Sequence, residues 1–234
     1  FYAASRQGVS LLARFSAPKI LSTNPKNAAA ELFAVPSPPA DFINRVTTID
    51  WPILAPIVEL YQKRLQDLPV EIHEVGSRCI QPKVSLVIPL YGRMDFVEHQ
   101  LMCFSSDPYI RNHCEILYVV DDERLIPSMM GSAQELFALY DTPFTWIWGN
   151  INRGFSGANN VGAAYARADA LLFMNSDVFP KEPGWLEQLV AALDNNSDIG
   201  IIGPRLLFAE GGIQHAGMIN RRLDSLGIWI NHHV

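Results

Sequence analysis

Four side chains that suit nucleotide binding follow directly after apolar runs of this 234-residue sequence: Tyr91, Asp121, Asn152 and Asp177. The ring of Tyr91 can stack on a flat base. The carboxylate of Asp121, which only accepts hydrogen bonds when it is ionised, can take the N–H of a pyrimidine or a guanine. If the apolar runs are strands of one parallel sheet, all four side chains lie at its carboxyl edge, where open α/β sheets bind ligands.

A glycine-containing loop supplies groups that suit phosphate. Residues 152–160 read NRGFSGANN. Gly154 and Gly157 have no Cβ, so the backbone can turn tightly there and approach a ligand closely. The backbone amides of Arg153 and Gly154 and the Arg153 guanidinium are donors for phosphate oxygens. A helix with a small inner face is predicted to begin at Ser156 or Gly157.

Asp177 creates a charge problem that favours a metal ion. A carboxylate about 4 Å from a phosphate oxygen is repelled by about 4 kcal/mol per charge pair at an effective dielectric constant of about 20. A divalent cation between Asp177 and a diphosphate reverses the sign of this interaction, and Mg²⁺ and Mn²⁺ prefer oxygen ligands. Such an ion would also neutralise charge on a departing nucleoside diphosphate. The competing interpretation is that Asp177 only caps the turn before Pro180.

These positions depend on four apolar strands that alternate with helices, predicted at 83–90, 115–120, 145–148 and 170–174. The last run fits a strand that is buried on both faces. Alternating strands and helices form right-handed crossovers and a parallel sheet. Beyond residue 195 the strands are short and surround a hairpin turn, which indicates an antiparallel region. The predicted fold class is therefore α/β, with a Rossmann-like, mixed but mostly parallel sheet flanked by helices.

Two of the helices have predicted inner faces that can be checked residue by residue. The helix before the third strand presents Met130, Ala133, Phe137 and Tyr140. The helix of the glycine loop presents Ala158, Val161, Gly162, Ala164, Tyr165 and Ala168. Small residues on the second face allow the helix to lie close to the sheet.

The predicted domain boundary lies between residues 82 and 83. Residues 1–40 are rich in Ala, Ser and Pro and have no sustained periodicity, which is typical of a connector. After Pro52, apolar residues recur at helical spacing. We therefore expect an extension over 1–82 with one amphipathic helix, followed by a nucleotide-binding domain over 83–234.

Composition excludes several classes of protein. The net charge of −6 and the isoelectric point of about 5.5 disfavour a nucleic-acid partner. No apolar run is long enough for a transmembrane segment. Cys79, Cys103 and Cys114 are odd in number and lack metal-ligand spacing, which favours a reducing compartment. The predicted location is the cytoplasm or the cytoplasmic face of the membrane. Because the sequence begins at Phe1 and stops at Val234 without a terminating element, we interpret it as a piece of a longer polypeptide.

The motifs resemble those of the family-two glycosyltransferases, which have the GT-A fold. Residues 87–92 (VIPLYG) are similar to the V-I-P-x-Y-N run that ends the family's first strand, and 120–124 (VDDER) to its V-D-D-x-S. Residues 152–160 match N-x-G-F-x-x-A-x-N, and 175–177 (NSD) occupy the metal-binding D-x-D position. Residues 200–218 are similar to a run of the rhamnosyltransferase-like branch.

The resemblance implies a metal-dependent, inverting transfer of a sugar from a nucleotide-sugar donor to a glycan or lipid-linked hydroxyl, as in polysaccharide biosynthesis. Asp177 is the implied ligand of Mg²⁺ or Mn²⁺. His215 is a further candidate, although a lone histidine near a turn more often has a structural role. The implied donor-binding residues are Pro89, Tyr91, Arg93, Asp121, Asn152, Arg153, Gly154, Asn159, Asn175 and Ser176.

The sequence departs from the family pattern in three places. Asn175 replaces the first Asp of the metal motif, and Glu123-Arg124 replace the small residues after the second Asp of V-D-D-x-S. The family's catalytic base follows a G-G-F-D-E-like region that does not occur before Val234. We therefore expect the base beyond Val234, and residues 1–234 to bind a nucleoside diphosphate with metal but to transfer sugar weakly or not at all.

Two other functions stay open. A decayed transferase that only binds the nucleotide sugar would keep the fold without the chemistry. A sugar nucleotidyltransferase shares the sheet type, but it requires a G-x-G-T-R-like loop where this sequence has Leu90-Tyr91-Gly92-Arg93. A dinucleotide dehydrogenase and a P-loop nucleotidase are disfavoured, because this sequence lacks the glycine motif that each of them requires.

Overall fold

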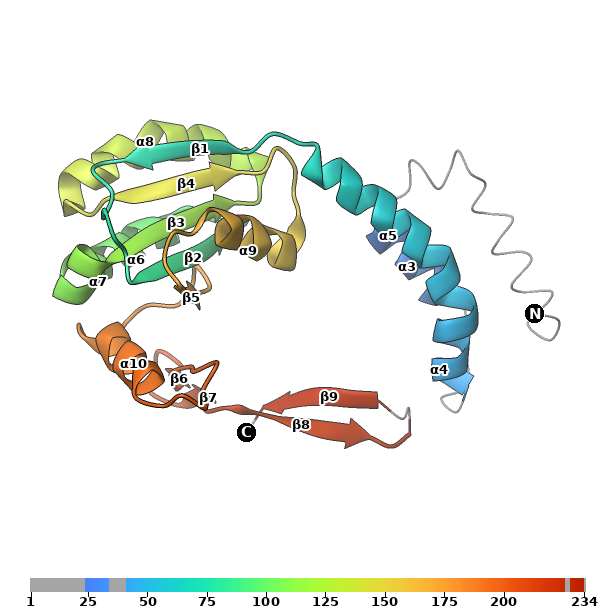
Figure 1. The fold of residues 1–234 in the computed structure, drawn as a ribbon. Coiled ribbons are helices and arrows are strands. Elements are labelled where there is room, and N and C mark those ends of the chain that lie inside the picture. The colour runs from blue at the N-terminus through green and yellow to red at the C-terminus, as the bar shows by residue number, and fades with distance from the viewer. Residues whose placement is uncertain (1–23, 34–40, 226–227, 234) are drawn as a thin grey trace. The chain divides into compact units, whose positions relative to one another are not determined.

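The computed structural model describes residues 24–33, 41–225 and 228–233 (Figure 1). The chain divides into two compact units. Residues 68–203 form one unit, and residues 1–67 with 204–234 form the other. Every predicted site residue except His215 lies in the unit of residues 68–203.

A five-stranded sheet forms the centre of the 68–203 unit, with strand order β1-β4-β3-β2-β5. Four neighbouring strands are parallel, and β1 pairs antiparallel with β4 at one edge. This is the mostly parallel, mixed sheet predicted from the sequence, so the fold class is confirmed. The strands are β1 (Glu71–Val75), β2 (Val84–Leu90), β3 (Cys114–Val120), β4 (Phe144–Trp148) and β5 (Ala170–Phe173).

Helices cover both faces of this sheet (Figure 1). Leu86 and Ile88 of β2 belong to the core that contains the inner residues of α6, α7, α8 and α10. Val87, between them, faces the opposite way and packs with Ala158 and Val161 of α9. This alternation follows from the two-residue period of a strand. The helices are α6 (Asp95–Ser105), α7 (Pro108–His113), η3 (Glu123–Leu125), α8 (Ile126–Tyr140), α9 (Gly154–Tyr165) and α10 (Trp185–Asp194).

Glycine allows α9 to lie close to the sheet. A Cβ on Gly162 would come within 2.3 Å of Val87 Cγ1 and 3.0 Å of Val119 Cγ2. These distances are shorter than carbon–carbon van der Waals contact. The predicted close approach of this helix is therefore confirmed, and it fixes where the loop before α9 reaches the sheet edge.

The second unit contains helices and two short antiparallel ladders. Ala28 and Leu32 of α3 pack with Ile53, Leu54 and Ile57 of α5, which is the amphipathic helix predicted after Pro52. In this unit β6 pairs with β7, and β8 pairs with β9. The elements are α3 (Pro25–Phe33), α4 (Phe42–Arg45), η2 (Val46–Asp50), α5 (Trp51–Gln66), β6 (Leu206–Leu207), β7 (Ile213–His215), β8 (Met218–Leu223) and β9 (Ile228–His233).

The structure corrects the predicted burial of β5. The run 170–174 was expected to be buried on both faces, but β5 is an edge strand whose Leu171 and Phe173 are 40% and 53% exposed. A short apolar run has the same composition in a central and in an edge strand, so the sequence does not distinguish them. β1 was not predicted at all, and it precedes residue 83.

Two helix faces also differ from the predictions. Met130 was placed on the inner face of α8, but it is 64% exposed and Met129 is buried instead. α9 ends at Tyr165, which is exposed together with Ala164. Within the described ranges, no helix combines the length and apolar character needed to cross a membrane.

Candidate functional site

The carboxyl ends of β2, β3, β4 and β5 meet at one edge of the sheet. The parallel registers pair Leu90 with Val120, Val120 with Trp148, and Val87 with Phe173. The amide of Asp121 donates to the carbonyl oxygen of Leu90 at 2.8 Å, which holds the ends of β2 and β3 together. The segments that follow these strands, which carry the predicted donor residues, therefore leave the sheet at the same edge.

Asp121 is buried and anchors the loop that precedes α9. Its Oδ1 accepts the backbone N–H of Arg153 at 2.6 Å, and its carbonyl oxygen accepts the Asn152 side-chain amide at 2.6 Å. Gly154 has φ +72°, a conformation that favours glycine. Asp121, Asn152, Arg153 and Gly154 thus form one contiguous group at the carboxyl edge, where the sequence predicted them.

The guanidinium of Arg153 folds back along its own loop. Its Nε and Nη2 donate to the carbonyl oxygen of Gly149 at 3.2 and 2.9 Å. A Cβ on Gly149 would lie 2.5 Å from Arg153 Nε, and one on Gly157 would lie 2.6 Å from Arg153 Cβ. A side chain at position 149 would therefore displace the Arg153 guanidinium, and one at position 157 would clash with the less movable Cβ of Arg153. The predicted contact of its guanidinium with phosphate stays a prediction.

A cluster of Asp122, Gly92 and Arg124 at this edge was not predicted from the sequence. Asp122 accepts the backbone N–H of Gly92 at 3.1 Å, and its two oxygens accept the Nε and Nη2 of Arg124 at 2.8 and 2.6 Å. The side-chain hydrogen bonds from Arg124 lower the pKa of Asp122 to about 2. Gly92 has φ +75° and follows Tyr91, whose ring is 64% exposed. Asp122 thus connects the loop of the exposed ring to β3.

The spacing of these residues contains a signal that could have identified the cluster. An Asp that precedes a helical turn commonly accepts the backbone N–H two residues later. Asp122 does so with Arg124 at 3.1 Å, at the start of η3. The Arg124 side chain then lies beside the carboxylate. The family pattern of small residues at this place gives no such expectation.

Pro89, Arg93 and Asn159 have local structural contacts. Pro89 lies within β2. The Arg93 guanidinium is paired with Asp95 and lies 4.2 Å from the centre of the Phe96 ring. The Asn159 amide donates to Phe155 O within α9 at 2.9 Å, and its Oδ1 is buried without a hydrogen-bond partner among the described residues. A role of these three residues toward a donor stays a prediction.

The turn after β5 presents the Asp177 carboxylate. Asp177 is exposed and makes no hydrogen bond or ion pair with any residue that the structure describes. Among the described residues there is also no group of three or more His, Cys, Asp or Glu that could hold a metal ion. One open carboxylate nevertheless fits Mg²⁺ or Mn²⁺, since such ions keep several waters and complete their coordination with substrate phosphates.

His215 lies in β7, opposite Leu206, in the other compact unit. Its contribution to a metal site stays a prediction.

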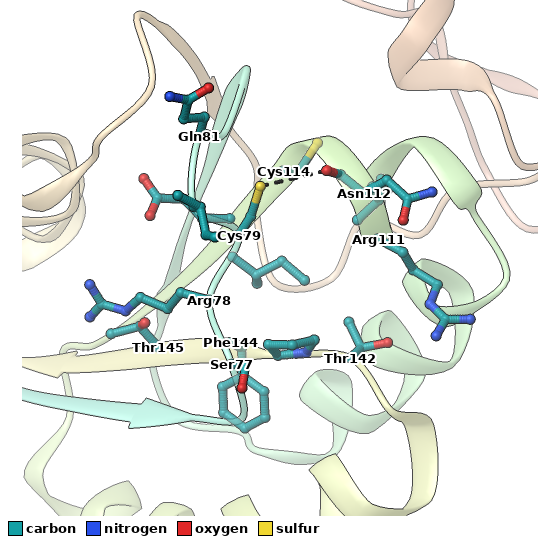
Figure 2. A pocket seen from close by; sticks show the side chains of 15 residues that line it. Ser77, Arg78, Cys79, Gln81, Arg111, Asn112, Cys114, Thr142, Phe144 and Thr145 are labelled. Carbon is teal, nitrogen blue, oxygen red and sulfur yellow. Dashed lines mark hydrogen bonds between the residues drawn. The ribbon is translucent and has the colours of Figure 1, made fainter.

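A cavity of about 460 Å³ lies at the opposite, amino edge of the sheet (Figure 2). Figure 2 shows residues of the β1–β2 connection around it, with Cys79 Sγ donating to Asn112 O at 3.6 Å. Cys114, at the start of β3, also lines it, and burial raises the pKa of its thiol to about 12. The lining contains none of the predicted donor residues.

Comparison with known proteins gives two curated relatives. The O-antigen biosynthesis protein RfbC of Myxococcus xanthus is 29% identical over 148 residues, which are 59% of this chain and 10% of that protein. The uncharacterized protein y4gI of Sinorhizobium fredii is 35% identical over 65 residues, 28% of this chain and 7% of that protein. The chain thus spans a tenth or less of the length of these relatives.

Two solved structures have a similar arrangement. One is the mannosyltransferase PcManGT from Pyrobaculum calidifontis in complex with GDP-Man and Mn²⁺, with 20% identity, a TM-score of 0.42, and 71% of this chain and 43% of that chain covered. The other is S. aureus TarS, with 17% identity, a TM-score of 0.39, and coverage of 54% and 24%.

The family comparison covers most of the sheet and the segments that leave its carboxyl edge. Residues 85–222, more than half of the chain, match the model of glycosyl transferase family 2. The match includes all the strands that end at the carboxyl edge. This protein therefore belongs to glycosyl transferase family 2, with the GT-A-type fold that its motifs predicted.

Proposed function

We propose that this chain binds a nucleoside-diphosphate sugar at the carboxyl edge of its sheet and transfers the sugar to a hydroxyl acceptor. Family membership supports glycosyl transfer as the reaction class. The observation that carries the donor site is the shared edge. Parallel registers bring the exposed ring of Tyr91, the Asp121–Arg153 loop and the Asp177 turn to the same edge of one sheet.

Each group at this edge has a part in donor binding. The exposed ring of Tyr91 offers a stacking surface for the base. The loop of Arg153 opens α9, and amides at a helix N-terminus attract phosphate. The Arg153 amide itself is bonded to Asp121, so the predicted phosphate contact falls to the amides that follow it. Asp177 would hold Mg²⁺ or Mn²⁺ together with the diphosphate. When bound, the ion supplies positive charge that stabilises the departing nucleoside diphosphate.

We propose that the transfer inverts the anomeric carbon. The acceptor oxygen forms a bond to the anomeric carbon from the face opposite the diphosphate. The bond between that carbon and the phosphate oxygen breaks, the nucleoside diphosphate takes the electron pair, and a base takes the hydroxyl proton. In this proposal the residues at the carboxyl edge hold the donor.

The proposed acceptor is a hydroxyl of a glycan or a lipid-linked glycan. The name of the Myxococcus relative, an O-antigen biosynthesis protein, supports a role in polysaccharide synthesis. We also propose a location in the cytoplasm or at the cytoplasmic face of a membrane. The odd number of cysteines, Cys79, Cys103 and Cys114, and their lack of metal-ligand spacing favour a reducing compartment.

One observation favours a second function, a nucleotide-sugar-binding module without transfer. Asn175 stands where the family pattern has an acidic residue, so the turn after β5 offers one carboxylate to a metal. Such a module would bind a nucleotide with little or no dependence on a divalent ion.

Calorimetry separates the two functions. UDP, GDP and dTDP are titrated separately into wild-type protein, Asp177→Ala and Asp169→Ala, each with Mn²⁺ and with a chelator. Asp169 is an exposed carboxylate at the amino end of β5, so its variant removes the same charge from the opposite edge. We expect Mn²⁺-dependent binding of at least one nucleotide by wild type and Asp169→Ala only. Binding that is independent of Mn²⁺ in all three proteins would favour the module, and no binding of any nucleotide would contradict the donor site.

A further inference from the structure

We propose that Gln100 is the positioning residue of the Asp177 turn, and this inference rests on the proposed function. Gln100 lies on α6, 75 residues before Asn175, and its side chain is fully buried. Among the described residues, its side chain makes no hydrogen bond with Asp121, Asp122 or Asp177. Its amide instead binds the backbone on both sides of Asp177.

Hydrogen bonds link Gln100, Asn175 and Val178 into a small frame around the turn. Its Nε2 donates to the carbonyl oxygen of Asn175 at 3.1 Å and to that of Val178 at 3.0 Å. The Val178 amide also donates to Asn175 O at 3.2 Å. Upstream, the Met174 amide donates to Val87 O at 3.1 Å, which ties the end of β5 to β2. Asn175, Ser176 and Asp177 are thus held at both ends while their side chains extend from the frame.

The chemistry of this contact requires a neutral side chain with two N–H groups. A primary amide has two donor hydrogens, and the two carbonyl oxygens use both of them. The Gln100 Oε1 is buried without a hydrogen-bond partner among the described residues, which is unfavourable by itself. A leucine would fill similar space but would donate to neither carbonyl oxygen, and Asn175 O would keep only the Val178 amide of these two donors. A glutamate would place a carboxylate against the same two acceptors.

The position of Gln100 couples the turn to the core. Val97, Leu101 and Phe104 of the same helix are fully buried in the main core. α6 is therefore a rigid support, and the hydrogen bonds of Gln100 fix the turn relative to this helix. The Asp177 carboxylate has no partner of its own among the described residues, so its direction depends on the backbone that Gln100 holds. Groups that orient a metal ligand in this way typically change metal affinity by about 10–100-fold when they are replaced.

The test compares Gln100→Leu and Gln100→Glu with Ser85→Ala as the matched control. Ser85 is also fully buried and also bonds two segments, through Glu115 Oε1 and the Ala168 amide, but at the amino end of β2. The first measurement is hydrogen exchange of the Val178 amide, whose bond to Asn175 O reports the frame without any ligand. The second is the affinity for UDP and for GDP, with Mn²⁺ and with a chelator.

We expect faster exchange at Val178 in both Gln100 variants and wild-type exchange there in Ser85→Ala. Mn²⁺-dependent affinity should fall by about tenfold or more in the Gln100 variants, while binding in chelator should stay unchanged. Unchanged Val178 exchange in a folded Gln100 variant would overturn the positioning role, and so would an equal loss of affinity in Ser85→Ala. Absence of Mn²⁺-dependent binding in wild type would instead contradict the proposed function, and the exchange measurement would still decide whether Gln100 holds the turn.

Discussion

The backbone amide of Arg153 donates to Oδ1 of Asp121 at 2.6 Å, so the carboxylate at the end of β3 holds the loop that opens α9. The side-chain amide of Asn152 binds the carbonyl oxygen of the same aspartate. Two adjacent loop residues are therefore fixed by one residue of the neighbouring strand end. A nucleotide at this edge would meet a loop that is already ordered by Asp121.

Replacing Asp121 should separate loop anchoring from charge. Asp121→Ala removes the acceptor of the Arg153 amide, and we expect a loss of about 1.5–3 kcal/mol in the free energy of unfolding, the usual range for a hydrogen bond to a charged group. Asp121→Asn keeps an oxygen acceptor and should lose less. Urea denaturation measures both variants. Equal losses would mean that the carboxylate charge, and not the bond to Arg153, supports the loop.

Glycine substitutions should show that the approach of α9 to the sheet is a packing requirement. In Gly162→Ala the new methyl group would meet Val87 at 2.3 Å, and overpacking of this kind typically costs about 1–3 kcal/mol. Gly131→Ala is the matched control, because Gly131 lies within α8 and a Cβ there has no neighbour within 4 Å. That control should be neutral or more stable by up to about 1 kcal/mol. Thermal and urea unfolding of both variants decide the point, and a stable Gly162→Ala would contradict it.

The sequence predicted the parts of the fold that depend on regular patterns. Four apolar runs with helices between them were sufficient for the parallel strands and for the shared carboxyl edge. β1 was missed because its sequence, EIHEV, has charged residues at positions that are exposed in an edge strand. The exposed face of β5 could not be predicted, because which strand lies at the edge depends on strand order and not on composition.

The same limit applies to the candidate site. Tyr91, Asp121, Asn152 and Asp177 were identified because each comes soon after a predicted strand. Tyr91 and Asp121 directly follow β2 and β3, whereas Asn152 and Asp177 lie in the segments after β4 and β5. The contact of Gln100 with the turn spans 75 residues, and nothing in the local sequence indicates it. Nor does the sequence show that the Arg153 guanidinium bonds Gly149 O, since an arginine can extend or fold back with the same backbone. The directions of the Gln100 and Arg153 side chains could therefore be learned only from the structure.

Removing one partner of the buried ion pair at the amino edge should strongly destabilise the fold. Glu115 is 5% exposed, and its oxygens accept the Ser85 hydroxyl, the Arg167 backbone amide and Arg167 Nε at 2.6, 2.6 and 2.7 Å. Glu115→Ala removes the acceptor of all three bonds, and breaking a buried pair typically costs about 3–5 kcal/mol. Arg167 is partly exposed, so we expect the lower end of this range.

Arg111→Ala is the control for that experiment. Arg111 and Asp141 form an ion pair at 2.9 Å in which both side chains are exposed, and such pairs contribute about 0–1 kcal/mol. Urea denaturation of the two variants should therefore differ by more than about 2 kcal/mol. Similar losses would show that burial of the Glu115 carboxylate is not the main reason for the loss in the free energy of unfolding.

Acid stability should depend on the Asp122–Arg124 pair. The hydrogen bonds from Arg124 hold the pKa of Asp122 at about 2, below its ordinary value of 3.8. A lowered pKa in the folded state means that this stabilisation is fully present above pH 3.8 and decreases as the pH falls toward 2. Arg124→Ala should return the pKa of Asp122 toward 3.8 and make unfolding less dependent on pH in this window.

NMR titration of the Asp122 carboxyl carbon measures the pKa directly, and unfolding at a series of pH values measures its effect. Arg93→Ala is a suitable control, because Arg93 pairs with Asp95 and does not bond Asp122. If Asp122 titrates near 2 in Arg124→Ala as well, another donor such as the Gly92 amide must cause the shift.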